Sequence, residues 1–486
     1  MTSRGSRIWL GIAVLLFLLQ ELPLFKARWV EDESWYSVTG YTFLKEGRLR
    51  NPTFAGTSDS RVDMKPPAMP LTLASAFRVF GVGIVPARLL SLIAGLALIP
   101  LVFLLGLELA GPGVAAAAAL LVATDNFVFV AARTARPEAY VTFFGTLAFL
   151  LWARSRRTRS LWLLLLSGLS AGIAVNYHPA AVALAFSLGC LVLFEFLRGF
   201  WKAPHLVAVT LGIAIALVPF ALWVRSDSAH YTAFRETYLR SGESQSLQQR
   251  LASERRRYAD FLGASSQRLP LPVNIPYRLH IAVALIASLA AVCWRNRRLA
   301  CTILITTLPI LLLWLYLPNK SPRYFAVIGP MLGILIGGAA FATWQAKRFI
   351  AVATVVVALI VVTQIAGNAM LLYRSRPADY SSVASELRRL IPAGQSAYGA
   401  ITFWMALHDR SFYSYNHSSF DYAMETVRPS YMIVKDRVMM SGEGYGEDDN
   451  AVLRQKCLAF TAAHGSFVGN VPNSFYGNLE VFELHY

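Results

Sequence analysis

The stretch that decides the fold is PARLLSLIAGLALIPLVFLLGLEL, residues 86–109, in which only Arg88 and Glu108 are charged. A helix needs about 20 largely apolar residues to cross the hydrocarbon core of a bilayer. Similar stretches recur along most of the chain, which has 486 residues, 56% of them hydrophobic, and a mean hydropathy of +0.48. This composition excludes a soluble globular protein and predicts a polytopic membrane protein.

We expect about eleven spans, because that many segments reach membrane-spanning length. They are residues 8–25, 86–109, 113–132, 138–153, 159–177, 179–197, 204–224, 278–294, 299–317, 324–342 and 349–370. Residues 67–80 are also apolar, but this segment is short and contains Arg78, so we expect an interfacial helix there. No small-residue cleavage site follows Phe25, so we expect the first segment to be retained.

Basic residues gather in short loops, a pattern that marks the cytoplasmic side of a membrane protein. They occur at Arg4 and Arg7 and in the loops at 154–159, 198–202, 295–298 and 347–348. With eleven spans, all of these loops lie on one side. We therefore expect a multi-pass protein of a bacterial inner membrane with a cytoplasmic N-terminus. The loops 26–85 and 225–277 and the end of the chain then face the periplasm.

The net charge of +17 belongs to the membrane part of the chain. From Arg376 onward there are nine basic and twelve acidic residues, so the preceding part carries +20. No basic tract interleaved with aromatic residues stands out, and we expect lipid phosphate rather than nucleic acid as the partner of this charge. The four cysteines are dispersed without a CxxC pair, which predicts neither a disulfide framework nor a metal site.

The last part of the chain differs from the rest. Short apolar runs at 431–434, 466–468 and 479–484 are separated by Gly, Asn and Pro, as in strands joined by turns. Residues 383, 387, 390 and 391 are apolar and share one helix face. We therefore expect a helical membrane domain at 1–372, which makes the protein mainly α, followed by a small periplasmic α/β domain at 373–486.

Polar side chains recur at the outer ends of the expected spans. They are Asp32, Glu33, Lys65, Arg133, Arg136, Glu138, Tyr177, His178, Arg323 and Tyr324. Because separate loops bring them to one depth of the membrane, we expect them to converge on one cavity.

Five segments of the chain, taken in order, resemble motifs of the GT-C glycosyltransferases. The resemblance is to the branch that includes protein O-mannosyltransferases and lipid A aminoarabinose transferases. DESWY at 32–36 is similar to Asp-Glu-x-x-Tyr, KPP at 65–67 to Lys-Pro-Pro, and ARLL at 87–90 to the Arg-Leu that opens the second span. Residues 133–138 resemble the second acidic motif, and PRY at 322–324 resembles an Arg-Tyr entry to a late span. The resemblance covers about residues 1–370. It implies sugar transfer from a polyprenyl-phosphate donor to an acceptor on the outer side of the membrane. We favour lipid A or another envelope glycolipid as the acceptor, with a protein acceptor as the alternative.

The chemistry of such a transfer suits these residue types. A leaving phosphate needs cations rather than a proton. An acceptor hydroxyl gains about 10²- to 10⁴-fold from a general base, and we expect Asp32 in that role. The other expected roles are hydroxyl positioning by Glu33 and Glu138, donor phosphate binding by Lys65, Arg323, Tyr324 and Arg255, and substrate contact by Tyr36, Arg136 and His178.

One position departs from the resemblance. In the aminoarabinose transferases a carboxylate precedes the lysine of the Lys-Pro motif and takes part in a metal site. This chain has Met64 there, a poor ligand for a hard cation. We therefore expect no bound metal and no other cofactor, although Asp32 with His178 leaves a divalent site possible.

Simpler explanations compete with these roles. Asp32 and Glu33 could be solvated loop acids, Lys65 a snorkelling lysine, and Arg255 part of a solvated or headgroup-facing helix. His178, which precedes Pro179, could be structural.

For the whole chain the alternative is a transporter or flippase, but transporters place ionisable groups near the bilayer midplane. A non-catalytic sensor or scaffold would leave the outer acids and the Lys-Pro-Pro segment unexplained.

Overall fold

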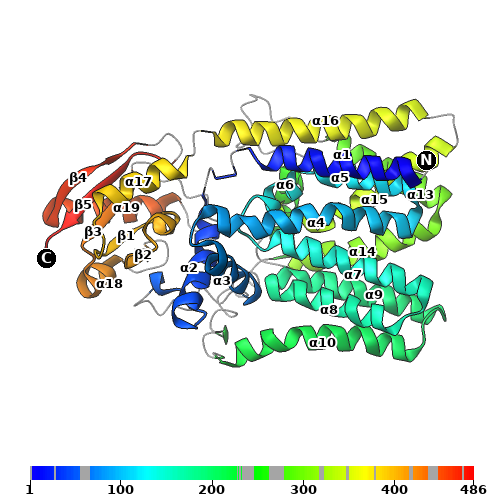
Figure 1. Ribbon diagram of the computed structural model, residues 1–486, viewed down its shortest axis with the longest axis horizontal. Helices are drawn as coiled ribbons and strands as arrows, with labels where there is room; N and C mark the ends of the chain where they lie inside the picture. The colour runs from blue at the N-terminus through cyan, green and yellow to red at the C-terminus, as the bar shows by residue number, and fades with distance from the viewer. Residues whose placement is uncertain are drawn as a thin grey trace.

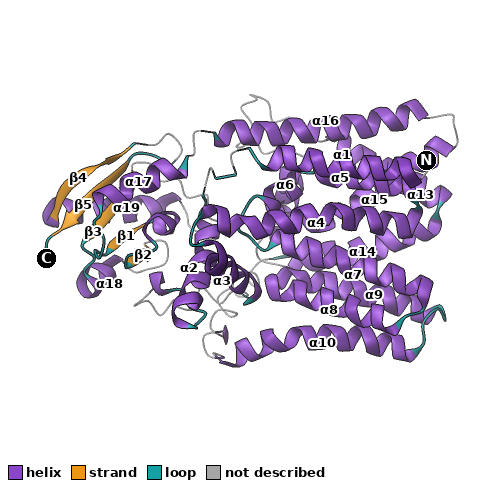
Figure 2. Cartoon of the chain, in the orientation of Figure 1, coloured by secondary structure: helices purple, strands orange, loops and turns teal. Residues whose placement is uncertain are grey.

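The computed structural model describes residues 3–23, 25–26, 29–54, 66–226, 228, 231–232, 246–261, 279–316, 322–345, 350–376, 379–414, 420–435, 447–472 and 476–486. A bundle of long helices forms one end of an elongated molecule, and a small body with a sheet forms the other (Figure 1). Figure 2 shows that the described strands all belong to the smaller body. The predicted fold class, a helical membrane bundle with a small α/β domain, is confirmed.

Each of the eleven predicted segments contains a helix, and the third contains two. The bundle helices are α1 (Ser3–Glu21), α4 (Ile84–Ala110), α5 (Pro112–Thr124), α6 (Asn126–Ala132), α7 (Glu138–Thr158), α8 (Leu161–Tyr177), α9 (Val182–Leu197), α10 (Ala203–Ser226), α13 (Leu279–Arg295), α14 (Arg297–Tyr316), α15 (Phe325–Gln345) and α16 (Ile350–Ser375). Among the described residues, six helices are long and apolar enough to cross a membrane, or seven if the bent pair α5–α6 is one span. The chain is therefore a multi-pass membrane protein, and the number eleven stays a prediction.

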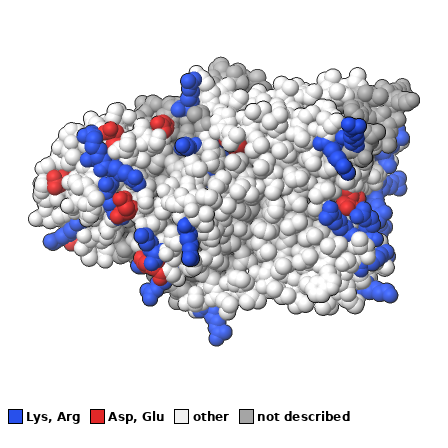
Figure 3. Space-filling view, viewed as in Figure 1, with Lys and Arg blue, Asp and Glu red and all other residues white. Residues whose placement is uncertain are grey.

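The surface of the bundle agrees with a position in a bilayer. In Figure 3, Lys and Arg side chains gather at the end of the bundle far from the α/β body. The band between this end and the α/β body has almost no charged side chains. The exposed basic residues at that end include Arg157, Arg198 and Arg298. Such a charge-free band fits hydrocarbon, and basic residues fit the phosphate region beside it.

Asp125 breaks the third apolar segment into α5 and α6, which meet at 62°. Its carboxylate accepts hydrogen bonds from the Phe127 and Val128 N–H groups at 2.8 and 3.0 Å, and so caps α6. The next residue, Asn126, donates to the Gln364 carbonyl of α16 at 2.8 Å. After this bend, α6 leads into the turn at 133–138, whose Ala135 N–H donates to the Glu33 carboxylate.

Two elements lie between the bundle and the α/β body in Figure 1: α2 (Glu31–Glu46) and α3 (Ala68–Phe80). They pack closely, since a Cβ on Gly40 would lie 2.8 Å from the Pro70 carbonyl oxygen. Val79 and Phe80 of α3 are 70% and 56% exposed. An amphipathic helix with exposed apolar residues beside a bundle suits the predicted interfacial position.

The α/β body contains one five-stranded sheet. Its strands, in the order β2-β1-β3-β5-β4, are β2 (Phe412–Ser414), β1 (Ala397–Gly399), β3 (Tyr431–Lys435), β5 (Leu479–Leu484) and β4 (Gly465–Val471). β1 runs parallel to β2 and β3, whereas β5 is antiparallel to β3 and β4. The helices of this region are α17 (Tyr380–Leu390), α18 (Phe420–Tyr422) and α19 (Glu447–His464). α16 continues to Ser375, past the predicted domain boundary at 372.

The described residues also contain five short helical turns and the longer helix α12. They are η1 (Pro52–Phe54), η3 (Pro179–Ala181), η5 (Pro322–Tyr324), η6 (Ile401–Leu407), η7 (Ala423–Val427) and α12 (Leu247–Phe261). Of these, η6 joins the α/β body to α2: the Tyr41 ring lies 5.6 Å from that of Trp404 and 5.7 Å from that of His408. The α/β body therefore rests on the helix that carries Asp32 and Glu33.

Candidate active site

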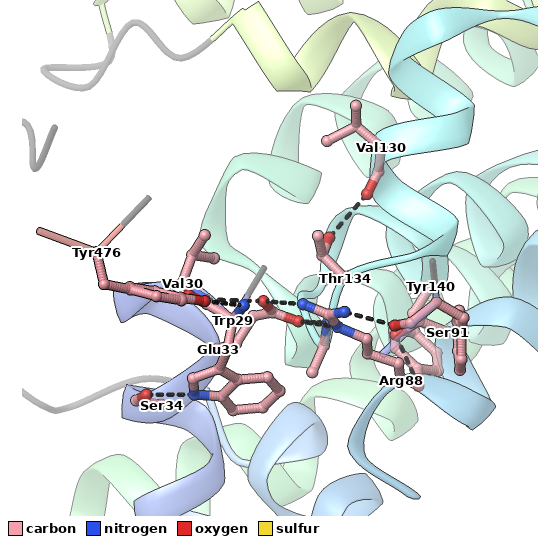
Figure 4. Close-up of polar contacts among 12 residues, drawn as sticks. Trp29, Val30, Glu33, Ser34, Arg88, Ser91, Val130, Thr134, Tyr140 and Tyr476 are labelled. Atoms are coloured by element: carbon pink, nitrogen blue, oxygen red, sulfur yellow. Dashed lines mark hydrogen bonds and ion pairs between the residues drawn. The ribbon is translucent and has the colours of Figure 1, made fainter. Parts of the chain in front are cut away.

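The first turn of α2 carries Glu31, Asp32 and Glu33, and their side chains point to different surroundings. Glu33 is 0% exposed and pairs with Arg88 of α4, which is 2% exposed. Arg88 Nε and one terminal nitrogen lie 2.8 Å from the two Glu33 oxygens (Figure 4). This bidentate pair locks α2 to α4.

Backbone N–H groups complete the surroundings of Glu33. Ala135 N–H donates to Oε1 at 2.8 Å and Val30 N–H donates to Oε2 at 3.1 Å. Substrate contact by Glu33, expected from the sequence, does not fit a carboxylate that is fully buried and bonded on both oxygens. The structure places Glu33 as the residue that fixes the 133–138 turn and the start of α2 to each other.

Asp32 faces the other way and is more accessible. Its side chain is 35% exposed and forms ion pairs with Arg136 and Arg323. The Arg323 guanidinium donates to Asp32 Oδ2 at 3.3 Å. Arg136 comes from the turn before α7 and Arg323 from η5, so three distant parts of the chain meet at this carboxylate.

Glu138 lies behind Arg136 at the start of α7. It is 3% exposed, and one of its oxygens accepts from an Arg136 terminal nitrogen at 2.7 Å. Arg136 Nε lies 3.1 Å from the same oxygen. Arg136 therefore bridges the two carboxylates, so that Glu138 holds the guanidinium and the guanidinium holds Asp32.

His178 and Tyr324 form a second polar pair on the same side. Ala180 N–H donates to His178 Nδ1 at 3.1 Å, which leaves the proton of a neutral imidazole on Nε2. Nε2 lies 3.4 Å from the Tyr324 hydroxyl. Tyr324 is the neighbour of Arg323, so this pair lies beside the ion pairs of Asp32.

An aromatic stack supports His178 from α7 and α8. The Tyr177 and Tyr140 rings are stacked with centroids 4.5 Å apart, and the Tyr177 hydroxyl lies 3.0 Å from Thr72 Oγ1 of α3. The expected interfacial helix is thus hydrogen-bonded to the residue that precedes His178.

The remaining sequence-predicted residues have different outcomes. Tyr36 is 6% exposed and lies one helical turn after Asp32, on the same face of α2. Arg255 is exposed on α12, and the structure does not bring it to the cluster; its neighbour Arg257 is buried instead, with its guanidinium 5.3 Å from the Trp314 and Phe325 rings. Lys65, like Met64, lies outside the described residues.

Sequence reasoning recognised Arg88 as part of a motif but assigned it no role. The signal was present, because an arginine inside an apolar segment is costly unless it is paired. Sequence reasoning treated Arg257 only as part of the basic run with Arg255, whereas Arg257 is buried and forms an ion pair with Glu254 three residues earlier on α12. That spacing on a helix is a recognisable pairing signal.

Among the described residues, no group of three or more His, Cys, Asp or Glu side chains has an arrangement that could hold a metal ion. The carboxylates that gather here, Asp32 and Glu138, have guanidinium groups as counter-ions. The arrangement can therefore present an accessible carboxylate next to cations and hydrogen-bond donors, as group transfer with an anionic leaving group requires.

Comparisons with known proteins agree with this architecture. A family model for dolichyl-phosphate-mannose-protein mannosyltransferase matches residues 64–223. An uncharacterized protein of Aquifex aeolicus (strain VF5) is 30% identical over 185 residues, which are 36% of this chain and 36% of that protein. The chain thus spans about a third of the length of this curated relative.

Two solved structures share the fold along most of the chain. ArnT from Cupriavidus metallidurans, solved with undecaprenyl phosphate, aligns with a TM-score of 0.67 at 15% identity and covers 99% of this chain and 98% of its own. The oligosaccharyltransferase of Archaeoglobus fulgidus, solved with a tethered acceptor peptide, aligns with a TM-score of 0.55 at 13% identity, over 89% and 69% of the two chains. At these identities the likeness is one of fold.

Proposed function

We propose that this chain is a membrane glycosyltransferase of the GT-C type, which transfers a sugar from a polyprenyl-phosphate donor to an outer-side acceptor. The family model over residues 64–223 and the fold shared with ArnT and the oligosaccharyltransferase support this proposal. The observation that carries the proposal is the accessible Asp32 carboxylate between Arg136 and Arg323. The undecaprenyl phosphate in the ArnT structure supports the donor class.

In this reaction the hydroxyl oxygen of the acceptor attacks the anomeric carbon of the donor sugar. Asp32 accepts the proton that this hydroxyl loses. The bond from that carbon to the phosphate oxygen breaks, and the polyprenyl phosphate leaves with the bonding electrons. Arg323 stabilises the negative charge that develops on this oxygen, and the His178–Tyr324 pair donates a hydrogen bond. Glu138 keeps Arg136, and through it Asp32, in place.

We propose that the reaction proceeds without a divalent metal. A metal bound by Asp32 would lie beside the Arg136 and Arg323 guanidinium groups, whose positive charges oppose a second cation there. Transfer assayed in membranes with excess EDTA should equal transfer with added Mg²⁺ or Mn²⁺. A rate that is lost in EDTA and restored by one metal contradicts this part of the proposal.

For the acceptor we favour a glycolipid over a protein. The hydroxyl of Tyr177, next to His178, contacts the interfacial helix α3, whose Val79 and Phe80 are exposed. A site beside such a helix can be reached from the outer leaflet. We further propose that the protein lies in a bacterial inner membrane with this site on the periplasmic side.

The proposed activity is tested by product analysis of membranes that contain wild type, Asp32→Asn or Glu46→Gln, supplied with labelled polyprenyl-phosphate sugar. We expect labelled acceptor with wild type and Glu46→Gln, and a loss of at least about 10²-fold with Asp32→Asn at equal protein levels. Label in extracted glycolipid or in protein distinguishes the two acceptor classes. Near-normal transfer by Asp32→Asn excludes this residue as the base.

The structure offers no comparable support for a transporter. Among the described residues, the buried polar side chains inside the bundle include Gln20, Asn126 and Asn368, which hydrogen-bond to one another and to backbone carbonyls. Such a network joins helices, whereas a transport pathway presents polar groups to a substrate.

A further inference from the structure

The backbone that leads into α2 is held by the C-terminal domain. Trp29 is 0% exposed, and its N–H donates to the Tyr476 hydroxyl at 2.7 Å. The same hydroxyl donates to the Trp29 carbonyl at 3.0 Å (Figure 4). Tyr476 precedes β5 and is separated from Trp29 by 447 positions. One side chain of the α/β body therefore satisfies both backbone groups of a residue at the membrane domain.

The Trp29 side chain is held from the opposite direction. Its indole N–H donates to Ser34 Oγ of α2 at 2.6 Å. Its ring lies 5.5 Å from the guanidinium carbon of Arg88. Trp29 thus connects the Tyr476 hydroxyl to α2 and to the buried Glu33–Arg88 pair.

Aromatic rings of the C-terminal domain surround this contact. The Tyr476 ring lies 5.8 Å from that of Tyr380 and 6.2 Å from that of Phe403, and the Tyr380 ring lies 6.4 Å from that of Trp29. Burial raises the pKa of Tyr380 well above its ordinary value, so its hydroxyl remains a donor, bonded to the Thr402 carbonyl at 2.7 Å. The Tyr476 hydroxyl is therefore presented by a packed aromatic cluster.

Trp29 immediately precedes the N-cap residue of α2. Val30 is the N-cap residue, and its carbonyl accepts from Glu33 N–H at 3.1 Å. Asp32 lies inside this first turn, so a displacement of Trp29 moves Asp32 with it. A displacement of about 1 Å at a reacting group can lower a rate by about 10²-fold.

We propose that Tyr476 is a positioning residue, through which the C-terminal domain sets the place of Asp32. Its effect on the rate rests on the proposed function, whereas its effect on the backbone at Trp29 does not. The domain would then act as part of the active site without contacting substrate.

The test compares Tyr476→Phe with Tyr380→Phe. Both variants keep a buried ring and lose one hydroxyl, but only the Tyr476 hydroxyl bonds across to Trp29. With monodisperse protein in detergent, we expect Tyr476→Phe to lower kcat by about 10- to 100-fold with an unchanged KM for the polyprenyl-phosphate sugar. Tyr380→Phe should keep the wild-type kcat. Equal kcat for Tyr476→Phe and wild type overturns the inference.

A second measurement does not depend on activity. Amide hydrogen exchange of the peptide that covers residues 29–36 should be faster in Tyr476→Phe than in wild type and unchanged in Tyr380→Phe. Unchanged exchange in Tyr476→Phe overturns the inference even when transfer is lost. Absence of transfer by wild type, together with the exchange difference, instead contradicts the proposed function and leaves the contact between the domains supported.

Discussion

Replacing Glu33 by Gln should lower the folding stability of the protein, because Glu33 forms a buried ion pair and is not expected to contact the substrate. The Glu33 carboxylate accepts two bonds from Arg88, one from Ala135 N–H and one from Val30 N–H, all between 2.8 and 3.1 Å. Glutamine has one acceptor oxygen, and its amide group would donate toward a guanidinium that only donates. Arg88, at 2% exposure, would remain charged and without its counter-ion.

The expected cost follows from burial. Breaking a buried ion pair by removing one partner typically costs about 3–5 kcal/mol, because a charge is left without compensation. α2 also offers a matched control, the Glu46–Arg50 pair at 2.6 Å, whose side chains are 40% and 56% exposed. Exposed pairs contribute about 0–1 kcal/mol, so Glu46→Gln should have little effect.

The assay is equilibrium unfolding in detergent micelles, followed by the loss of helical signal as SDS is added. Glu33→Gln should unfold at a lower SDS fraction than wild type, and Glu46→Gln at the wild-type fraction. The double variant Glu33→Gln/Arg88→Met should be more stable than Glu33→Gln, because it removes the unpaired charge. A Glu33→Gln protein that is as stable as Glu46→Gln but inactive would refute the positioning role and support substrate contact.

Three further predictions concern the donor, the bundle and the topology. Arg323→Ala should weaken binding of a polyprenyl-phosphate analogue by about 10- to 100-fold, since a charge-assisted bond contributes about 1.5–3 kcal/mol, whereas Arg255→Ala should not; equal binding by both variants contradicts the phosphate assignment. Gly212→Val should lower the unfolding midpoint, because a Cβ there would lie 2.1 Å from the Leu165 carbonyl oxygen, whereas Gly189→Val, with nothing within 4 Å of its Cβ, should not; equal midpoints would argue against this close α8–α10 contact. A reporter fused after Tyr486 should be active only if it functions in the periplasm, and cytoplasmic activity would contradict the predicted orientation.

Local sequence patterns predicted most of the fold, because each apolar segment must form all of its backbone hydrogen bonds within itself. Inside hydrocarbon only a helix does so, so a run such as 86–109 specifies α4 without reference to the rest of the chain. The break at Asp125 escaped this reasoning, since the residues on both sides remain apolar. There the carboxylate caps a new helix and Asn126 bonds to α16, and neither contact is visible from hydropathy.

The sequence predicted which residues gather at the candidate site better than it predicted the contacts of each one. Asp32, Arg136, Glu138 and Arg323 could be expected together, because their loops share one side of the membrane. The sequence could not separate the roles of Asp32 and Glu33, which are adjacent acids in one motif. It also could not connect Tyr476 to Trp29, because contacts between positions so distant leave no local pattern.

The sequence by itself determined the membrane class, the helical segments and the face on which the acids gather, since these depend on composition and on charge near segment ends. Only the tertiary structure decided the surroundings of each acid. Successive residues on a helix point about 100° apart, so α2 can bury Glu33 against Arg88 while Asp32 remains accessible between Arg136 and Arg323. Which of the two faces is buried depends on how α2 packs against α4 and beneath the C-terminal domain, and that packing is a property of the whole chain.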